Sequence, residues 1–264
     1  MRLKGARVIV TGASQGIGRA IALEFGRRGA RLAVASRNRP ALEELAASIM
    51  AEGGSAIVIP TDVTAAGAVE QLAQDTIREL GGIDILVNNA GLGMTAQIGD
   101  ASSADVEAVF SLNVLAAAAA IRAVVPIMRA QHDGMIINIS SIAGRIVIPR
   151  IGYYSATKFA LTAIGDALRM EEADRGIKVM NVFPGTTRSN FGENRLGARG
   201  RQAHQRLPPV TAEKVARRIA TAVERNQRSV YISWIPDRAA LAANWIAGWA
   251  VRAVLRSWAR RAQA

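Results

Sequence analysis

The chain has 264 residues, of which 50% are hydrophobic and 20% are charged. This composition supplies enough apolar side chains for a sizeable core, so it excludes a mainly disordered chain and favours one large domain over two small ones. There is no cysteine, and the only histidines are His132 and His204. These counts exclude disulfides, a cysteine nucleophile and a thiolate or histidine-rich metal site. We therefore expect no bound metal and no catalytic histidine.

The net charge of +12 is concentrated towards the C-terminus, where residues 186–264 contain 15 basic and 4 acidic side chains. Such a basic segment is either a solvated face or a surface for anionic lipid, nucleic acid or an acidic partner. We recognise no nucleic-acid-binding motif, and aromatic residues make up only 5% of the chain, so we expect no nucleic-acid partner. The N-terminus does not resemble a signal peptide. We expect a cytoplasmic protein, with peripheral membrane contact as an open alternative.

Short apolar runs alternate with amphipathic stretches along most of the chain. We predict seven strands, at residues 7–11, 31–36, 56–60, 84–87, 135–139, 177–183 and 229–233. We predict helices at residues 16–29, 40–52, 65–80, 104–131, 153–175 and 212–225. This alternation implies right-handed crossovers, so it predicts the α/β class and a single-domain Rossmann-type doubly wound parallel sheet of about seven strands.

Two segments depart from this alternation. Residues 188–209 are polar, rich in glycine and arginine, and without clear periodicity, which is typical of a functional lid or loop. Residues 237–261 are predicted to form one further helix, which begins behind Pro236 and ends in arginines. We therefore divide the chain into a Rossmann-type domain, residues 1–236, and a basic, tryptophan-containing helical extension, residues 237–264. The extension either packs on protein or lies on an anionic membrane surface.

A glycine-rich loop, TGASQGIG at residues 11–18, connects the first predicted strand to the first predicted helix. Its glycines allow a tight turn and a close approach of the backbone to a pyrophosphate. The helix N-terminus adds free N–H groups and the positive end of a dipole. In this strand–turn–helix context, the loop predicts a dinucleotide-binding site.

Further motifs follow in a fixed order. They are NNAG at residues 88–91, Asn113 inside the long helix, Ser140-Ser141 after the fifth strand, YSATK at residues 154–158, and Pro184-Gly185 after the sixth strand. With the TGxxxGxG loop, these motifs resemble those of the short-chain dehydrogenase/reductase family over about residues 5–235. The resemblance implies a set of cofactor-binding residues. They are Gly12, Ser14, Gln15, Gly16, Ile17, Gly18, Asp62, Val63, Asn89, Ala90, Gly91, Tyr154, Lys158, Pro184, Gly185, Thr187 and Ser189.

The end of the second strand indicates which nicotinamide cofactor is used. A carboxylate at this position would bind both ribose hydroxyls and repel a 2′-phosphate, but Ser36 stands here and Arg37 follows it. A small hydroxyl beside a guanidinium suits the 2′-phosphate of NADP. The plainer interpretation is that Arg37 is merely exposed. We expect both residues to bind the cofactor and NADP(H) to be preferred over NAD(H).

Tyr154 and Lys158 are four residues apart on a predicted helix, so they lie on one face, a turn apart. A free phenol has a pKa of about 10, and a nearby ammonium group lowers that pKa by stabilising the phenolate. Tyr154 could then protonate a carbonyl oxygen in reduction or accept the hydroxyl proton in oxidation. Tyr153 is five residues from Lys158 and points around the helix to a different side.

The resemblance implies two further catalytic residues, Ser141 and Asn113. Ser141 precedes Tyr154 by the separation seen in the family, and its hydroxyl would hold the substrate oxygen against the tyrosine. Adjacent strand residues point to opposite faces, so Ser140 is the alternative. Asn113, through its backbone or side chain, would hold a water that links Lys158 to solvent. A helix kink with local hydrogen bonding is also compatible with Asn113.

These residues predict an NADP(H)-dependent oxidoreductase acting on a ketone or secondary alcohol. The predicted pocket wall combines residues 92–98, 144–153 and 188–209, and its apolar part suggests a lipophilic small-molecule substrate. The apolar residues are Ile142, Ile146, Val147, Ile148, Pro149 and Ile151. The family commonly pairs its long helices, so we expect a homodimer or homotetramer. The alternative function is a non-catalytic nucleotide-binding scaffold or sensor that docks on a membrane or partner through the basic C-terminal third.

Overall fold

The structure is a computed structural model that describes residues 1–188, 191, 195–197 and 209–233. Ser189, most of the predicted loop 188–209, His204 and the predicted helix 237–261 lie outside the described residues.

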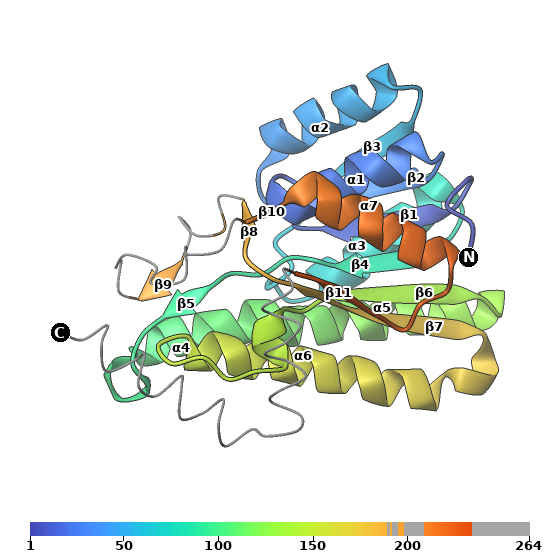
Figure 1. Cartoon of the computed structure of the whole chain (residues 1–264). Coiled ribbons are helices and arrows are strands. Elements are labelled where there is room, and N and C mark those ends of the chain that lie inside the picture. The colour runs from blue at the N-terminus through green and yellow to red at the C-terminus, as the bar shows by residue number, and fades with distance from the viewer. Residues whose placement is uncertain (189–190, 192–194, 198–208, 234–264) are drawn as a thin grey trace.

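The described chain forms a seven-stranded sheet in which every pair of neighbouring strands is parallel. The strand order is β11-β7-β6-β4-β1-β2-β3 (Figure 1). In chain order the strands are β1 (Arg7–Thr11), β2 (Arg31–Ser36), β3 (Ser55–Pro60), β4 (Ile85–Asn88), β6 (Gly134–Ile139), β7 (Ile177–Pro184) and β11 (Ser229–Ile232). The order reverses between β1 and β4, which is where ligands bind in sheets of this kind.

Helices cover both faces of the sheet (Figure 1). They are α1 (Gly16–Arg27), α2 (Arg39–Ala51), α3 (Ala68–Leu80), α4 (Ser103–Phe110), α5 (Ala116–Gln131), α6 (Gly152–Glu171) and α7 (Ala212–Glu224). One core cluster joins the sheet to α1, α2 and α7 through side chains such as Phe25, Leu45 and Ile219. The other core cluster joins it to α3, α5 and α6 through Leu72, Val124 and Leu168. The predicted doubly wound α/β fold is confirmed.

The helices differ slightly from their predicted ranges. The helix predicted from residue 65 begins at Ala68, because Gly67 has a φ of +73° and breaks the helical conformation in front of it. α2 begins as expected, with the Asn38 side chain accepting a hydrogen bond from the Ala41 amide. The helix predicted at residues 104–131 contains a π-helical segment, Ser111–Leu115, between α4 and α5.

The combined helix Ser103–Gln131 is long and apolar enough to cross a membrane, with a mean hydropathy of 2.0 in its most apolar window. Half of that window is buried inside the fold. Ile121, Val124 and Met128 of this helix belong to the core cluster that it shares with the sheet. Its apolar character is therefore explained by packing on the sheet.

Two small parallel sheets were not predicted. β5 (Met94–Thr95) pairs with β9 (Leu196–Gly197), and β8 (Thr187–Arg188) pairs with β10 (Val210–Thr211). Strands of two residues have no periodicity that a sequence could reveal. They attach parts of the segment after β7 to the carboxyl end of the main sheet, where the predicted site residues lie (Figure 1).

Candidate active site

The glycine-rich loop is shaped by the backbone of two glycines and by contacts of a third. Gly12 and Gly16 have φ values of +63° and +57°, which other L-residues rarely adopt. A Cβ on Gly18 would lie 2.4 Å from the carbonyl oxygen of Gly12, so only glycine fits where the helix meets the turn. Gln15 caps α1 without a side-chain hydrogen bond. The loop thus presents a closely packed backbone and a helix N-terminus, which suits a pyrophosphate.

Asn89 and Thr11 hold this loop against the end of β4. The Asn89 side chain donates hydrogen bonds to the carbonyl oxygens of Thr11 (2.9 Å) and Gly12 (3.0 Å). The Thr11 hydroxyl accepts hydrogen bonds from the amides of Asn89 and Ala90, both at 3.1 Å, and donates one to the carbonyl oxygen of Val87. Thr11 was not singled out from the sequence, although it is the first residue of the TGxxxGxG motif. Asn89 and Thr11 therefore hold the glycine-rich loop in place from within the protein.

The residues predicted to select the cofactor lie together at the ends of β2 and β3. Ser36 pairs with Pro60 in the sheet register, and its hydroxyl oxygen accepts a hydrogen bond from the Asn38 amide. Arg37 is exposed. Hydrogen bonds from the hydroxyl and amide of Thr64 lower the pKa of Asp62, and the nearby charge of Arg37 adds to this effect. Val63, next to Asp62, is buried. This edge presents a guanidinium beside a small hydroxyl, and Asp62 stays ionised.

Tyr154, Ser141 and Lys158 converge at the carboxyl end of β6. Tyr154 and Lys158 come from α6, and Ser141 follows the strand. The Lys158 ammonium is buried, donates a hydrogen bond to the Ile139 carbonyl oxygen at 2.9 Å, and lies 5.8 Å from the centre of the Tyr154 ring. Burial lowers the pKa of Lys158 to about 8. Burial raises the pKa of Tyr154, while its hydrogen bond with Ser141 and the charge of Arg195 act in the opposite direction.

The geometry separates Ser141 from Ser140 and Tyr154 from Tyr153. The buried Ser140 hydroxyl is hydrogen-bonded to the Lys158 carbonyl oxygen (3.1 Å) and the Thr162 hydroxyl (2.9 Å), so it ties β6 to α6. The Tyr153 hydroxyl donates a hydrogen bond to the Ile98 carbonyl oxygen at 3.3 Å. Of the two serines, Ser141 is the one hydrogen-bonded to Tyr154.

Asn113 lies in the π-helical segment, buried, with its side chain fully engaged. Its amide oxygen accepts a hydrogen bond from the Leu92 amide (2.8 Å), and its amide nitrogen donates to the Leu92 carbonyl oxygen (2.9 Å) and the Thr157 hydroxyl (3.0 Å). A Cβ on Gly91 would lie 3.0 Å from the Asn113 amide oxygen and 3.5 Å from the Lys158 ammonium. Asn113, Gly91 and Lys158 are therefore close neighbours, and the asparagine side chain fixes the loop after β4.

The loop after β7 completes this end of the site. The Gly185 amide donates a hydrogen bond to the Ile232 carbonyl oxygen at 2.9 Å, and the Thr187 hydroxyl donates one to the Gly185 carbonyl oxygen at 3.1 Å. The loop begins at Pro184, the last residue of β7. Its predicted contact Ser189 lies outside the described residues.

Two side chains near Tyr154 were not singled out from the sequence. The Phe191 ring lies 5.9 Å from the Tyr154 ring, centre to centre, and is tilted by 59°. Arg195 donates a hydrogen bond to the Thr95 hydroxyl at 3.2 Å. Both come from the segment predicted as a pocket wall, but no motif distinguishes them from its other residues. Within the opposite predicted wall, Ile146 is buried and Val147 is exposed.

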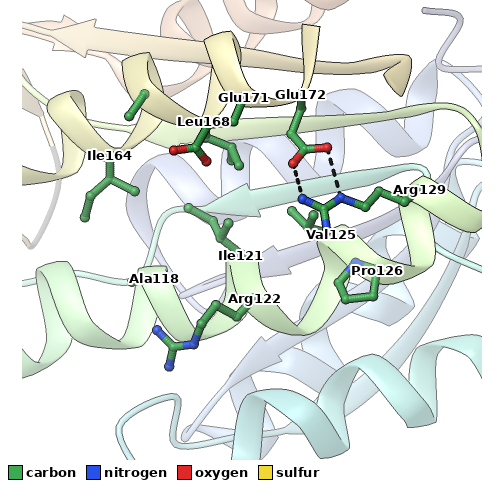
Figure 2. A pocket seen from close by; sticks show the side chains of 11 residues that line it. Ala118, Ile121, Arg122, Val125, Pro126, Arg129, Ile164, Leu168, Glu171 and Glu172 are labelled. Carbon is green, nitrogen blue, oxygen red and sulfur yellow. Dashed lines mark hydrogen bonds and ion pairs between the residues drawn. The ribbon is translucent and has the colours of Figure 1, made fainter. Parts of the chain in front are cut away.

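One groove of the described structure lies away from these residues. A groove of about 460 Å³ runs between α5 and α6, and none of the predicted cofactor or catalytic residues lines it (Figure 2). Among the described residues, no group of three or more His, Cys, Asp or Glu side chains is placed to hold a metal ion.

A family model of short chain dehydrogenases matches residues 6–199. The chain belongs to the short-chain dehydrogenase family. It is similar to an NADP-dependent 3-hydroxy acid dehydrogenase from Schizosaccharomyces pombe, with 32% identity over 235 residues that cover 87% of this chain and 91% of that protein. It is 34% identical over 248 residues to dehydrogenase/reductase SDR family member 7B from Mus musculus, covering 90% of this chain and 76% of that protein. Some relatives are much longer, since the chain spans only 15% of the glycine betaine reductase of Emericella nidulans.

Two solved structures of dehydrogenases share the fold. A short-chain dehydrogenase/reductase from Burkholderia phymatum in complex with NAD has a TM-score of 0.81 and 25% identity, and the match covers 97% of this chain and 93% of that one. An alcohol dehydrogenase from Thermococcus sibiricus, complexed with 5-hydroxy-NADP, has a TM-score of 0.76 at 24% identity, covering 86% of this chain and 94% of that one. The chain is therefore an oxidoreductase of this family with the family's Rossmann-type fold.

Proposed function

We propose that this short-chain dehydrogenase transfers hydride between NADP(H) and a ketone or secondary alcohol. The observation that carries the proposal is the grouping of Ser141, Tyr154 and Lys158 at the carboxyl end of β6. The glycine-rich loop follows β1, at the same edge of the parallel sheet. The 3-hydroxy acid dehydrogenase of S. pombe supports the reaction type, because the dehydrogenation of a hydroxy acid oxidises an alcohol to a carbonyl group.

The described residues fit a dinucleotide. A Cβ on Gly12 would lie 2.9 Å from the Cα of Ala90, so the loop and the end of β4 meet without side chains between them. This leaves backbone amides and the N-terminus of α1 for the phosphates. Ser14, Gln15 and Ile17 lie in this loop, and Asn89, Ala90 and Gly91 would line the other side of the cofactor. The cofactor, when bound, supplies or accepts the hydride.

The preference for NADP(H) rests on Ser36 and Arg37. No carboxylate stands at the end of β2 to accept bonds from the ribose hydroxyls, and the exposed Arg37 guanidinium is free to reach a 2′-phosphate. Its charge acts on Asp62, which supports a position of Arg37 near the adenosine end of the proposed site. The S. pombe relative is NADP-dependent by name, whereas the B. phymatum structure holds NAD.

In this mechanism Tyr154 transfers the proton and Ser141 holds the substrate oxygen. During reduction the neutral phenol protonates the carbonyl oxygen, and the Lys158 ammonium stabilises the phenolate that results. The Asn113 side chain is committed to Leu92 and Thr157, so a water that relays protons to Lys158 would bind the backbone of the π-helical segment. π-helical segments leave backbone groups outside the regular hydrogen-bond pattern and are frequent at functional sites.

A panel of ketones with NADPH and NADH, followed at the nicotinamide absorbance, tests this function. We expect ketone-dependent oxidation of NADPH with a higher kcat/KM than that of NADH. The alternative, a nucleotide-binding scaffold or sensor, predicts NADPH binding without turnover of any ketone or alcohol. A scaffold has no need of Ser141, Tyr154 and Lys158 in contact, which is why we favour the enzyme.

We further propose that two copies of the chain pair through the groove between α5 and α6. Ile121, Val125, Ile164 and Leu168 line it with apolar surface, and the ion pair of Arg129 with Glu172 closes one end (Figure 2). Light scattering should show at least a dimer at micromolar concentration. Ile164→Glu should give a monomer, whereas Met170→Glu, which changes an exposed residue of α6 outside the groove lining, should not. A monomeric unmodified chain would contradict the proposal.

A further inference from the structure

Arg195 is held beside the proposed catalytic tyrosine by the small sheet of β5 and β9. It directly precedes β9, whose pairing with β5 places Leu196 opposite Met94. The Leu196 amide donates a hydrogen bond to the Gly93 carbonyl oxygen at 3.0 Å, and Arg195 itself donates one to the Thr95 hydroxyl. The backbone of Arg195 is thus held by the pairing of β9 with β5, and its side chain is held by the hydrogen bond to Thr95.

The side chain of Arg195 is half-buried among the described residues. Its Nε is inaccessible to solvent and has no hydrogen-bond partner among the described residues. Within the described part of the chain, no carboxylate forms an ion pair with it, whereas Arg7, Arg28 and Arg169 each have one. Burial lowers the pKa of Arg195. Withdrawing a cation from water without a nearby anion costs free energy, so a ligand with a negative charge would be stabilised beside Arg195.

Arg195 faces the reacting end of the site. Its charge lowers the pKa of Tyr154, against the effect of burial. Phe191, four residues before Arg195, packs against the Tyr154 ring. The segment therefore sets one cation and one aromatic ring next to the hydroxyl that would bind the substrate oxygen.

Gly93 makes room for both side chains. A Cβ at this position would lie 3.0 Å from the Cγ of Arg195, 3.2 Å from its Nε and 3.1 Å from the Cε1 of Phe191. Contacts this short require the neighbours to move. The glycine thus allows the arginine and the phenylalanine to approach the loop after β4 closely.

We propose that Arg195 binds the carboxylate of the substrate, which assigns the enzyme to oxo acids and hydroxy acids rather than to neutral ketones. The inference rests on the proposed function, because it names the substrate class of the same site. A guanidinium pairs with a carboxylate through two parallel hydrogen bonds and fixes its orientation. One cation matches the single charge of a carboxylate better than the double charge of a phosphate. The apolar wall around Ile146 would contact the rest of the molecule.

The test compares acids with their uncharged esters. The full-length protein is assayed with NADPH against 2-, 3- and 4-oxooctanoate and the methyl ester of each. For at least one position of the keto group, we expect kcat/KM for the acid to exceed that for its ester by about tenfold or more. Arg195→Gln should lower this acid-to-ester ratio about tenfold, and Arg195→Lys should restore part of it. Arg78→Gln, which removes an exposed arginine of α3, should leave the ratio unchanged.

The ratio separates carboxylate binding from other roles of Arg195. If Arg195→Gln lowers the rates for acid and ester equally, the arginine acts through Tyr154 or the fold of its segment, and the proposal is wrong. A wild-type preference for the esters at all three positions also overturns it.

A binding measurement keeps the proposal testable if no ketone is reduced at all, an outcome that would refute the proposed function alone. Octanoate and octanamide are titrated into the protein with saturating NADP⁺ by calorimetry. We expect octanoate to bind at least about tenfold more tightly than the amide, and Arg195→Gln to abolish the difference. Equal affinities in the unmodified protein would overturn the role of Arg195. Thermal unfolding of each variant shows whether it is folded.

Discussion

The Lys158 ammonium lies 5.8 Å from the centre of the Tyr154 ring, and it is anchored by a hydrogen bond to the Ile139 carbonyl oxygen. Both side chains belong to α6, one turn apart, and the anchor is the last residue of β6. Helix and strand together therefore hold a buried cation beside a phenol. Burial raises the pKa of Tyr154. A cation held nearby stabilises the phenolate that remains after proton transfer, so the reactivity of Tyr154 depends on this arrangement.

Replacing Tyr154 removes the proposed proton donor without removing the ring. Tyr154→Phe should lower kcat for ketone reduction by about 1,000-fold or more, since general acid catalysis contributes up to about 10⁴-fold and the substrate oxygen also loses a hydrogen bond. The Kd for NADPH, measured by fluorescence titration, should change less than threefold. Tyr153→Phe is the matched control and should retain activity, because the Tyr153 hydroxyl donates a hydrogen bond to the Ile98 carbonyl oxygen. Near-normal turnover of Tyr154→Phe would refute the mechanism.

The pH dependence should reveal Lys158. Burial lowers its pKa to about 8, so the ammonium carries its charge below that pH and loses it as the pH rises. The neutral phenol of Tyr154 persists through the same range because burial raises its pKa. We therefore expect kcat/KM for ketone reduction, at saturating NADPH, to be constant below about pH 8 and to fall above it. Lys158→Met should give a low rate without this decline. A wild-type profile that stays flat to pH 10 would contradict the role of the ammonium.

Cofactor preference should change with the residues at the end of β2. In Ser36→Asp with Arg37→Ala, a new carboxylate can bind the ribose hydroxyls of NADH, and the guanidinium for the 2′-phosphate is absent. Each change is worth on the order of 1.4 kcal/mol, so the ratio of kcat/KM for NADPH over NADH should fall about 100-fold. Arg27→Ala is the control for the loss of an exposed arginine, because Arg27 is the last residue of α1 and is far along that helix from the glycine-rich loop. A wild-type enzyme that already prefers NADH would show that Ser36 and Arg37 do not select the cofactor.

The seven strands of the main sheet could be predicted to within one or two residues. A short, nearly continuous apolar run is typical of a strand that is buried on both faces of a parallel sheet. β1 and β2 have the predicted bounds, Arg7–Thr11 and Arg31–Ser36. The π-helical segment Ser111–Leu115 could not be predicted, because its apolar pattern continues that of α4 and α5. Its register is set by tertiary contacts, among them the bonds from Asn113 to Leu92.

The site likewise contains residues that the sequence predicts and residues whose place only the structure shows. Tyr154 and Lys158 are one helical turn apart, and Gly12 stands in a strand–turn–helix motif, so local geometry predicts each of these parts. The resemblance of the ordered motifs to those of the family predicts that the parts act together. Arg195 is one of 29 arginines, and its place beside Tyr154 depends on pairing between β5 and β9, which are about 100 residues apart in the chain. The choice between Ser140 and Ser141 likewise required the structure, because both positions fit the alternation at the end of a strand.

The last prediction concerns a row of three buried asparagines that crosses the centre of the sheet. Asn88, Asn138 and Asn181 occupy matching positions of β4, β6 and β7. The Asn88 side chain donates to Asn138 at 3.1 Å, and that of Asn138 donates to Asn181 at 3.2 Å. α6 approaches so closely that a Cβ on Gly165 would lie 2.3 Å from the Asn181 amide oxygen. The row thus binds three strands and one helix into a single unit directly beneath the proposed active site.

Asn138→Ala would leave a buried donor of Asn88 and a buried acceptor of Asn181 without their partner. Each unsatisfied group costs about 1–3 kcal/mol, so we expect the free energy of unfolding to fall by about 2–6 kcal/mol. Urea denaturation at one fixed protein concentration measures this, because oligomerisation contributes to apparent stability. Gly165→Ala should destabilise the same unit by crowding the asparagines, whereas Gln71→Ala, on the exposed side of α3, should change stability by less than about 0.5 kcal/mol. An Asn138→Ala protein as stable as the unmodified chain would mean that these hydrogen bonds add nothing net to the fold.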